Sequence, residues 1–347
     1  MAASTAAVCG SGGALALLDL VEGRTVRLIE GAVASRGDEG DLEGGADITA
    51  CCMAWDGTAV VAGDAAGSLA VWGTPEAEVS LRWAGHASAV TGCRLAQRAP
   101  VVLATTSAEG VAMWDLARQP GVPTWQGQPG DAAWGLESTC CAVSHDGRLL
   151  VTGSDDGRVV LWDPRAGSAH VASLGRQGSG LRDSAGWGGS PGARLRARRG
   201  VAGRWELLRD PSLGPIKGVD LAADAPTLVA CGLRGVFVFD LRQGGLASAA
   251  HWEGVGEEVS KVAAGCCCAS PAGDVTVAGD GFGTVGLWRR QGIPPGSAAD
   301  VVGTWEPTAQ LHVGEGDETV VGCEVAVEGG WLAACTLTGD VRVWAAP

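Results

Sequence analysis

The sequence of 347 residues predicts an all-β fold made of one short unit repeated seven times. The first observation is the segment 149–163, LLVTGSDDGRVVLWD, which contains an apolar strand, a tight Gly/Asp turn and a second strand ending in Trp-Asp. The second is that a turn glycine is followed four or five residues later by a large apolar residue at Gly13 and Leu18, Gly67 and Trp72, Gly110 and Trp114, Gly157 and Trp162, Gly235 and Phe239, Gly283 and Trp288, and Gly339 and Trp344.

Further strands are predicted before and after each pair of strands that a glycine turn joins. A step of eleven residues separates Trp72 from Trp83 and Trp114 from Trp125, which indicates a fourth strand after the third. First strands of small apolar residues are expected at 48–55, 89–96, 139–144, 216–222, 262–269 and 319–327. One such sheet cannot bury both of its faces alone, so the units are expected to pack radially around an axis.

Four short strands per unit, with Trp114-Asp115, Trp162-Asp163 and Phe239-Asp240 at the ends of third strands, resemble the WD-repeat (WD40) β-propeller family over the whole chain. The resemblance implies a single seven-bladed propeller domain, residues 1–347. It also implies structural roles for Trp72, Trp114, Trp162, Phe239, Trp288, Trp344, His86 and Asp155. Stacking of the Trp residues on a ligand is a weaker interpretation, because regular spacing on a strand is what packing between sheets requires.

The family's buried polar network departs from its usual pattern here. That network uses a His, a Ser or Thr, a turn Asp and the Trp, and only Gly85-His86 supplies the His in the expected turn. Ser154, Asp155 and Trp162 keep three members, and no repeat matches all four. The blades are therefore expected to depend on apolar packing.

The first and last blades are expected to be incomplete. The chain starts at an apparent second strand, 5–9, and stops after a third strand, 341–344. Three explanations remain open: about 20 upstream residues are absent from this sequence, a partner donates the missing strands, or the ring closes in a distorted way.

Composition limits the class of protein. Hydrophobic residues make up 46% of the chain, which excludes a disordered protein. Twelve cysteines lie in apolar stretches without C-x-x-C spacing, so buried free thiols in a reducing compartment are favoured over a disulfide framework. Neither a signal peptide nor an apolar stretch of about 20 residues is evident. A cytoplasmic or nuclear protein is expected.

The net charge of −14 is unevenly placed. By resemblance, the turns between second and third strands and the connections between blades open on one face, and we term this the acidic face. Its candidate partner-binding residues are Asp38, Glu39, Asp41, Glu43, Asp131, Glu137, Glu257, Glu258, Glu315, Asp317 and Glu318. These acids either cap turns and confer solubility, or they recruit Arg- or Lys-rich segments of a partner.

An Arg/Gly-rich insertion is predicted at about 172–203, between Trp162 and Trp205, and is expected to be a structureless loop. Its basic candidates are Arg194, Arg196, Arg198 and Arg199. Three interpretations of this loop remain open: it has no function, it binds an acidic protein, or it contacts nucleic acid. The overall negative charge argues against extended duplex binding.

No catalytic or metal-binding pattern is found in the sequence. The five histidines are scattered without metal-ligand spacing, and phosphate loops and nucleophile elbows are missing. The sequence predicts no enzyme, no cofactor and no metal. The predicted function is a non-catalytic protein–protein interaction scaffold or adaptor subunit, and the alternative is an RNA-associated factor that uses the Arg-rich insertion.

Overall fold

The computed structural model contains two compact units, Met1–Asp155 and Asp156–Pro347, which are considered separately. The boundary falls in the tight turn of the segment 149–163, so the fourth repeat is divided between them. The structure describes residues 5–9, 14–19, 24–29, 47–54, 56–73, 79–96, 102–118, 121–127, 137–166, 172–175, 196–199, 204–209, 215–223, 225, 227–232, 235–241, 245–250, 265–290, 305–313, 318–325 and 331–345.

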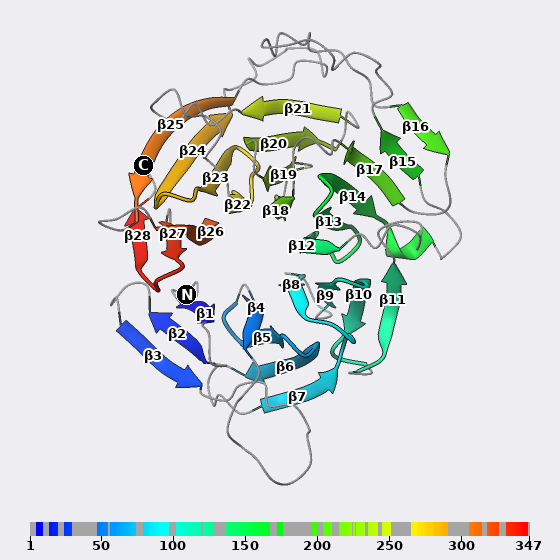
Figure 1. The fold of residues 1–347 in the computed structure, drawn as a ribbon, viewed down its shortest axis with the longest axis vertical. Coiled ribbons are helices and arrows are strands. Elements are labelled where there is room, and N and C mark those ends of the chain that lie inside the picture. Colours follow the sequence, from blue (N-terminus) through cyan, green and yellow to red (C-terminus); the bar gives the residue numbers. More distant parts are fainter. Residues whose placement is uncertain are drawn as a thin grey trace. The chain divides into compact units, whose positions relative to one another are not determined.

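The described part of unit 1 consists of antiparallel sheets (Figure 1). The first has the order β1-β2-β3, with strands Thr5–Cys9, Leu15–Asp19 and Arg24–Ile29. The second contains β4 (Ile48–Met53), β5 (Ala59–Asp64), β6 (Ser68–Gly73) and β7 (Val79–Ala84). The third contains β8 (Val90–Leu95), β9 (Val102–Ser107), β10 (Gly110–Asp115) and β11 (Pro123–Gly127). The unit ends with the pair β12 (Ser138–Val143) and β13 (Leu150–Ser154).

Unit 2 opens with β14 (Arg158–Trp162), which pairs with β17 (Arg204–Arg209) and is followed by the short 3₁₀ helix η1 (Pro164–Ala166). The next sheet contains β18 (Ile216–Leu221), β19 (Thr227–Gly232), β20 (Gly235–Asp240) and β21 (Gly245–Ala250). It is followed by β22 (Cys266–Ala269), β23 (Val275–Gly279), β24 (Thr284–Arg290) and β25 (Trp305–His312). The last sheet has the order β26-β27-β28, with strands Val320–Val325, Trp331–Thr336 and Val341–Ala345.

Along the described chain, the strands follow the seven predicted repeats, so the all-β repeat fold is confirmed. The first and last sheets each contain three strands among the described residues, as expected. The expectation of a structureless insertion is wrong at its two ends, because β15 (Ala172–Gly175) pairs antiparallel with β16 (Arg196–Arg199). Backbone pairing satisfies the N–H and C=O groups there. The single-domain organisation remains a prediction.

Large residues of four third strands pack in clusters with the preceding sheet of their unit. Trp72, 1% exposed, packs in one cluster with Leu15 and Leu17 of the first sheet. Trp114, also 1% exposed, packs in another with Val61 of the second sheet. In unit 2, Trp288 and the half-buried Trp344 occupy the corresponding positions, and Trp162 and Phe239 are also buried. The structural roles predicted for these residues follow from this burial.

First strands approach one another closely through small side chains. Thr49 Oγ1 donates a hydrogen bond to Val90 O at 2.6 Å, and Thr91 Oγ1 donates one to Ser138 O at 2.5 Å, so each bond joins successive first strands. The twelve cysteines are all free thiols, and many lie in this layer. Burial raises the pKa of the Cys141 thiol to about 12, which keeps it protonated and unreactive.

The turn glycines that precede the third strands require a backbone that other residues rarely adopt. Six of those predicted lie in the described part of the chain and have positive φ, for example +86° at Gly67 and +95° at Gly339. A Cβ on Gly67 would lie 2.2 Å from the carbonyl oxygen of His86, whereas one on Gly339 would meet nothing within 4 Å. Both the positive φ and the nearby carbonyl oxygen therefore require glycine at position 67, whereas only the positive φ requires it at position 339.

We predict that Gly67→Ala lowers the free energy of unfolding by about 2 kcal/mol or more, because left-handed strain adds to a backbone clash. Gly339→Ala should cost only the conformational part, about 1–2 kcal/mol. Gly281→Ala is the control, since open space surrounds its Cβ position, and should change stability by no more than about 0.5 kcal/mol. Urea denaturation measures the loss of unfolding free energy in each variant. Equal losses in all three would contradict the predicted order.

Candidate protein-binding face

The turns between second and third strands are capped by the residue that ends the second strand. Asp64 Oδ1 accepts hydrogen bonds from the N–H groups of Ala66 and Ser68 at 2.9 and 2.7 Å. Asp280 Oδ1 accepts equivalent bonds from Phe282 and Thr284, both at 2.8 Å. Because both carboxylates are buried, they act as turn caps and do not present charge to a partner.

A second recurring bond joins each turn to the segment that leads into the first strand of the same sheet. Ala65 N–H donates to Asp47 O at 2.9 Å, Asp155 N–H to Glu137 O at 3.2 Å, and Leu337 N–H to Thr319 O at 2.9 Å. Turns and lead-in segments therefore lie side by side on one edge of each sheet, and their side chains contribute to one surface.

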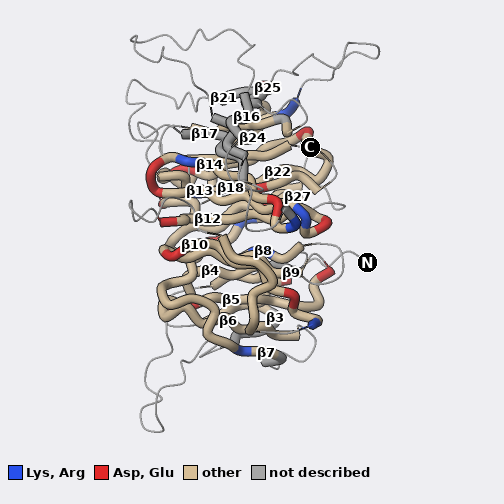
Figure 2. Tube along the Cα trace, turned by 90° about the vertical axis from the view of Figure 1, so that its right-hand side faces the viewer, with Lys and Arg blue, Asp and Glu red and all other residues tan. Residues whose placement is uncertain are grey.

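Exposed acids gather on this acidic face within each unit. In unit 1, exposed carboxylates come from Asp47, Glu109, Glu137 and Asp155. In unit 2, Asp340 is exposed and Glu318 half-buried, whereas Asp156 forms an ion pair with Arg158 at 2.7 Å. Figure 2 colours the acids red, and most red segments fall on turns and strand ends.

Only part of the predicted acidic set lies in the described chain. Of this set, Glu137 and Glu318 lie on the acidic face. Asp155, for which a structural role was predicted, is exposed on the same face. Outside the described residues lie Asp38, Glu39, Asp41, Glu43, Asp131, Glu257, Glu258, Glu315 and Asp317. Asp47, Glu109 and Asp340 complete the described set, and their positions in lead-in segments or turns are the sequence signal for them.

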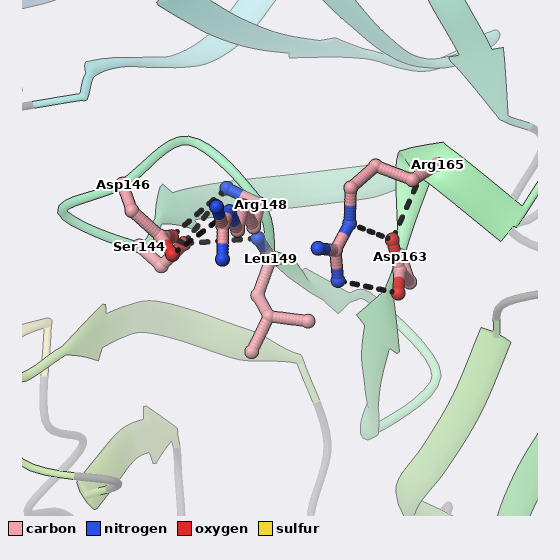
Figure 3. Close-up of polar contacts among 6 residues, drawn as sticks. All are labelled: Ser144, Asp146, Arg148, Leu149, Asp163 and Arg165. Carbon is pink, nitrogen blue, oxygen red and sulfur yellow. Dashed lines mark hydrogen bonds and ion pairs between the residues drawn. The ribbon is translucent and has the colours of Figure 1, made fainter. Parts of the chain in front are cut away.

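On the opposite edge of the sheets, charges pair locally. Asp163, the acid of a Trp-Asp dipeptide in unit 2, accepts two bonds from the Arg165 guanidinium, both at 2.9 Å (Figure 3). These bonds, with the Arg165 backbone N–H, hold the pKa of Asp163 below its usual value despite some desolvation. In unit 1, Asp115 pairs with Arg118 at 3.7 Å. Arg118 and Arg165 are thus partly neutralised by neighbours in sequence.

A first-to-second-strand turn on the same side of unit 1 shows the same local pairing (Figure 3). Ser144 Oγ donates to Asp146 Oδ1 at 2.7 Å and accepts from the Leu149 N–H at 2.9 Å. Asp146 also forms an ion pair with the Arg148 guanidinium at 3.4 Å. The turn therefore contributes little net charge to its surroundings.

The basic insertion in unit 2 forms a short ribbon at its base. Arg196, Arg198 and Arg199 lie on β16, where Arg198 faces Ser173 and Arg199 faces Ala172 in the register. Arg194 lies outside the described residues.

The third sheet contains a polar network centred on His86. Its Nε2 lies 2.8 Å from Thr105 Oγ1, and its Nδ1 lies 3.0 Å from Ser107 Oγ. Trp114 Nε1–H donates to the same Thr105 oxygen at 2.8 Å. Glu109 takes the position of the turn acid, and one of its carboxylate oxygens accepts from the Ala87 N–H at 3.4 Å.

The third repeat still lacks the turn aspartate, because Glu109 stands in its place. The third sheet nevertheless assembles the other three members, since His86, Thr105 and Trp114 are joined by hydrogen bonds and Ser107 adds a second hydroxyl. In the second sheet, Ala62 stands where Thr105 would be, and Trp72 Nε1 has no hydrogen-bond partner among the described residues. Packing alone holds that tryptophan.

We predict that His86 makes stability depend on pH. Burial lowers the pKa of His86, although the Glu109 carboxylate opposes the shift. As the pH falls below about 6.5, the unfolded chain takes up a proton before the folded one does, so the contribution of His86 is present above that pH and lost below it. His86→Gln should cost about 1–3 kcal/mol at pH 8.

The difference in unfolding free energy between the wild type and His86→Gln should shrink from pH 8 to pH 5. Chemical denaturation at several pH values measures it. A difference that stays constant or grows in acid would show that His86 is not held neutral by the fold.

Other site types find no support among the described residues. No group of three or more His, Cys, Asp or Glu side chains there is arranged to hold a metal ion. In the same part of the chain, no helix is long and apolar enough to span a membrane.

Repeated sheets of short antiparallel strands, in which most described third strands bury a large residue after a glycine turn, are the pattern of WD40-type β-propellers. Residues 135–163 match the family model described as "WD domain, G-beta repeat" and form a WD repeat. A chain in the crystal structure of the mitotic checkpoint complex covers 98% of this chain with a TM-score of 0.66 at 14% sequence identity, and 83% of that chain is matched. This likeness shows the fold.

Curated relatives match part of the chain. The angio-associated migratory cell proteins of Homo sapiens, Pongo abelii and Canis lupus familiaris are each 30% identical over 131 residues. That alignment covers 38% of this chain and 28% of the length of each relative. The resemblance to the WD-repeat family is thus supported by the repeat, the relatives and the fold together.

Proposed function

We propose that this protein is a non-catalytic scaffold or adaptor subunit that binds Arg- or Lys-rich segments of partner proteins on its acidic face. WD40 propellers generally mediate protein–protein interactions in complexes, and the structural neighbour is a chain from the structure of a complex. The observation that carries the proposal is the contrast between exposed Glu137 and Asp155 on the acidic face of unit 1, which form no ion pair with a described Lys or Arg, and Asp115, Asp146 and Asp163 on the opposite edge, each of which pairs with a neighbouring Arg.

The contrast matters because of its effect on the electrostatic field. Among the described residues, Glu137 and Asp155 form no ion pair with Lys or Arg, and a backbone hydrogen bond holds their segments together. Acids that are not neutralised nearby add to a negative field that steers and orients a cationic partner. Paired acids such as Asp163 add little to such a field.

The proposal also includes the cellular location, the donated strand and the absence of catalysis. Free thiols at all twelve cysteines are consistent with a cytoplasmic or nuclear location. A partner that donates a strand is compatible with the last sheet, since β28 has no outer neighbour among the described strands. The absence of catalysis is inferred from the family, which generally uses its surfaces for binding.

We predict that a short fluorescein-labelled peptide rich in Arg and Lys binds the protein and that binding weakens as salt rises. The double variant Glu137→Gln/Asp155→Asn should weaken it roughly fivefold, because two nearby charges are lost. Asp146→Asn is the matched control, since Asp146 is exposed but already paired with Arg148 on the opposite edge. Fluorescence anisotropy measures each affinity.

Three outcomes would contradict the acidic-face proposal. They are equal losses in the double variant and the control, binding that is insensitive to salt, and no binding of the basic peptide at all. The melting temperature of each variant should match that of the wild type, which confirms that a change in affinity is not caused by unfolding.

The alternative function, an RNA-associated factor, is favoured by one observation. The β15–β16 pair holds Arg196, Arg198 and Arg199 on one short strand, which concentrates positive charge that phosphates could neutralise. The same anisotropy measurement with a labelled oligoribonucleotide distinguishes the two. Binding that is lost in Arg196→Gln/Arg198→Gln, with basic-peptide binding absent, would favour the RNA alternative.

A further inference from the structure

The last two sheets of unit 2 expose large apolar side chains on the acidic face. Phe282 is 37% exposed, Val321 is 46% exposed and Leu337 is 75% exposed. Phe282 lies in the turn between β23 and β24, Leu337 in the turn between β27 and β28, and Val321 near the start of β26. Exposed large apolar residues in tight turns disfavour solubility, so a cluster of them calls for an explanation.

Backbone hydrogen bonds place these three segments next to one another. Val320 N–H donates to Asp280 O at 2.8 Å, which joins the start of β26 to the turn that holds Phe282. Leu337 N–H donates to Thr319 O at 2.9 Å, which joins the same lead-in to the next turn. Phe282, Val321 and Leu337 are each no more than two residues along the chain from a residue that forms one of these bonds. The three side chains therefore belong to one surface.

The fold itself does not require apolar residues at these positions. In the register of the other repeats, Leu337 corresponds to Ala65, Ala108, Asp155 and Gly281. Phe282 corresponds to Ala66, Glu109, Asp156 and Thr338, and Val321 to Thr49, Thr91, Thr139 and Lys217. Small or polar residues occupy the same turn positions and strand starts in the second, third and fourth repeats, so folding does not require large apolar side chains there.

The charges around the cluster indicate what would cover it. Across 280–284, 318–321 and 336–340, the ionisable residues that are exposed or half-buried are Glu318 and Asp340, whereas Asp280 is a buried turn cap. The Glu318 carboxylate accepts a hydrogen bond from Thr338 Oγ1, which holds it beside the turn of Leu337. Arg342 on β28 is the nearest base along the chain and is itself exposed. An apolar centre with an acidic rim suits an apolar residue flanked by cationic ones.

We propose that Phe282, Val321 and Leu337 form an anchor site for a large aliphatic or aromatic side chain in a partner protein segment whose neighbouring residues are Arg or Lys. This inference rests on the proposed function and specifies the partner of the acidic face. The acidic rim disfavours nucleic acid and anionic lipid, because both would bring negative charge against Glu318 and Asp340. The apolar contact supplies affinity, and the rim supplies orientation.

The test uses two fluorescein-labelled basic peptides that differ only at a central residue, which is Leu in one and Ser in the other. The wild type should bind the Leu peptide about tenfold more tightly, as expected for burial of one large side chain at the site. Phe282→Ala and Leu337→Ala, singly and together, should reduce this preference to less than about twofold while leaving affinity for the Ser peptide unchanged.

Val122→Ala is the matched control, because Val122 is 50% exposed at the start of β11 in unit 1, away from the described cluster along the chain. It should leave the tenfold preference intact. Equal binding of both peptides by the wild type, or a preference that survives the double variant, would overturn the anchor site and leave the acidic-face proposal standing. If neither peptide binds, both proposals fail.

Discussion

A large side chain that follows a positive-φ glycine turn and is wedged between two sheets is the constraint on which the rest of this structure depends. The turn sets the register of the third strand, and the register determines which face the tryptophan enters. In unit 1, this places Trp72 against the first sheet and Trp114 against the second. Burial of side chains of this size contributes several kcal/mol each, far more than any surface ion pair in the molecule.

The same turns determine how the acidic face is built. A buried acid, serine or threonine at the end of the second strand satisfies the turn N–H groups, as Asp64, Asp280 and Thr336 do. The next positions are then free of any folding role and can carry function. In unit 1 they carry exposed acids such as Asp155, and in unit 2 they carry the apolar residues Phe282 and Leu337. The residue that caps the turn and the residues proposed to contact a partner are thus neighbours in the sequence.

The sequence predicted most of the fold because its signals are local. The glycine turn, the third-strand tryptophan and the small residues of the first strands recur at fixed steps, and each step corresponds to one described strand. The β15–β16 ribbon was not predicted, because Gly-rich flanks hide a pairing between residues that are far apart in the chain.

The candidate site was less accessible to sequence reasoning. Burial separates the capping acid Asp64 from the exposed acid Asp155, and composition treats both alike. The role of Thr105 in the His86 network depends on which strand face it occupies. The cluster of Phe282, Val321 and Leu337 joins three segments that only the hydrogen bonds between lead-ins and turns bring together.

The most direct test of the central claim compares the unfolding free energies of three Trp→Ala variants. Trp72→Ala and Trp114→Ala remove wedges that are 1% exposed, and each is predicted to cost about 3–5 kcal/mol. Trp331 begins β27, the second strand of the last sheet, and is 40% exposed, so Trp331→Ala should lower the free energy of unfolding by no more than about 1 kcal/mol. Equal losses in all three, or a small loss in Trp72→Ala, would contradict the view that third-strand wedges hold the sheets together.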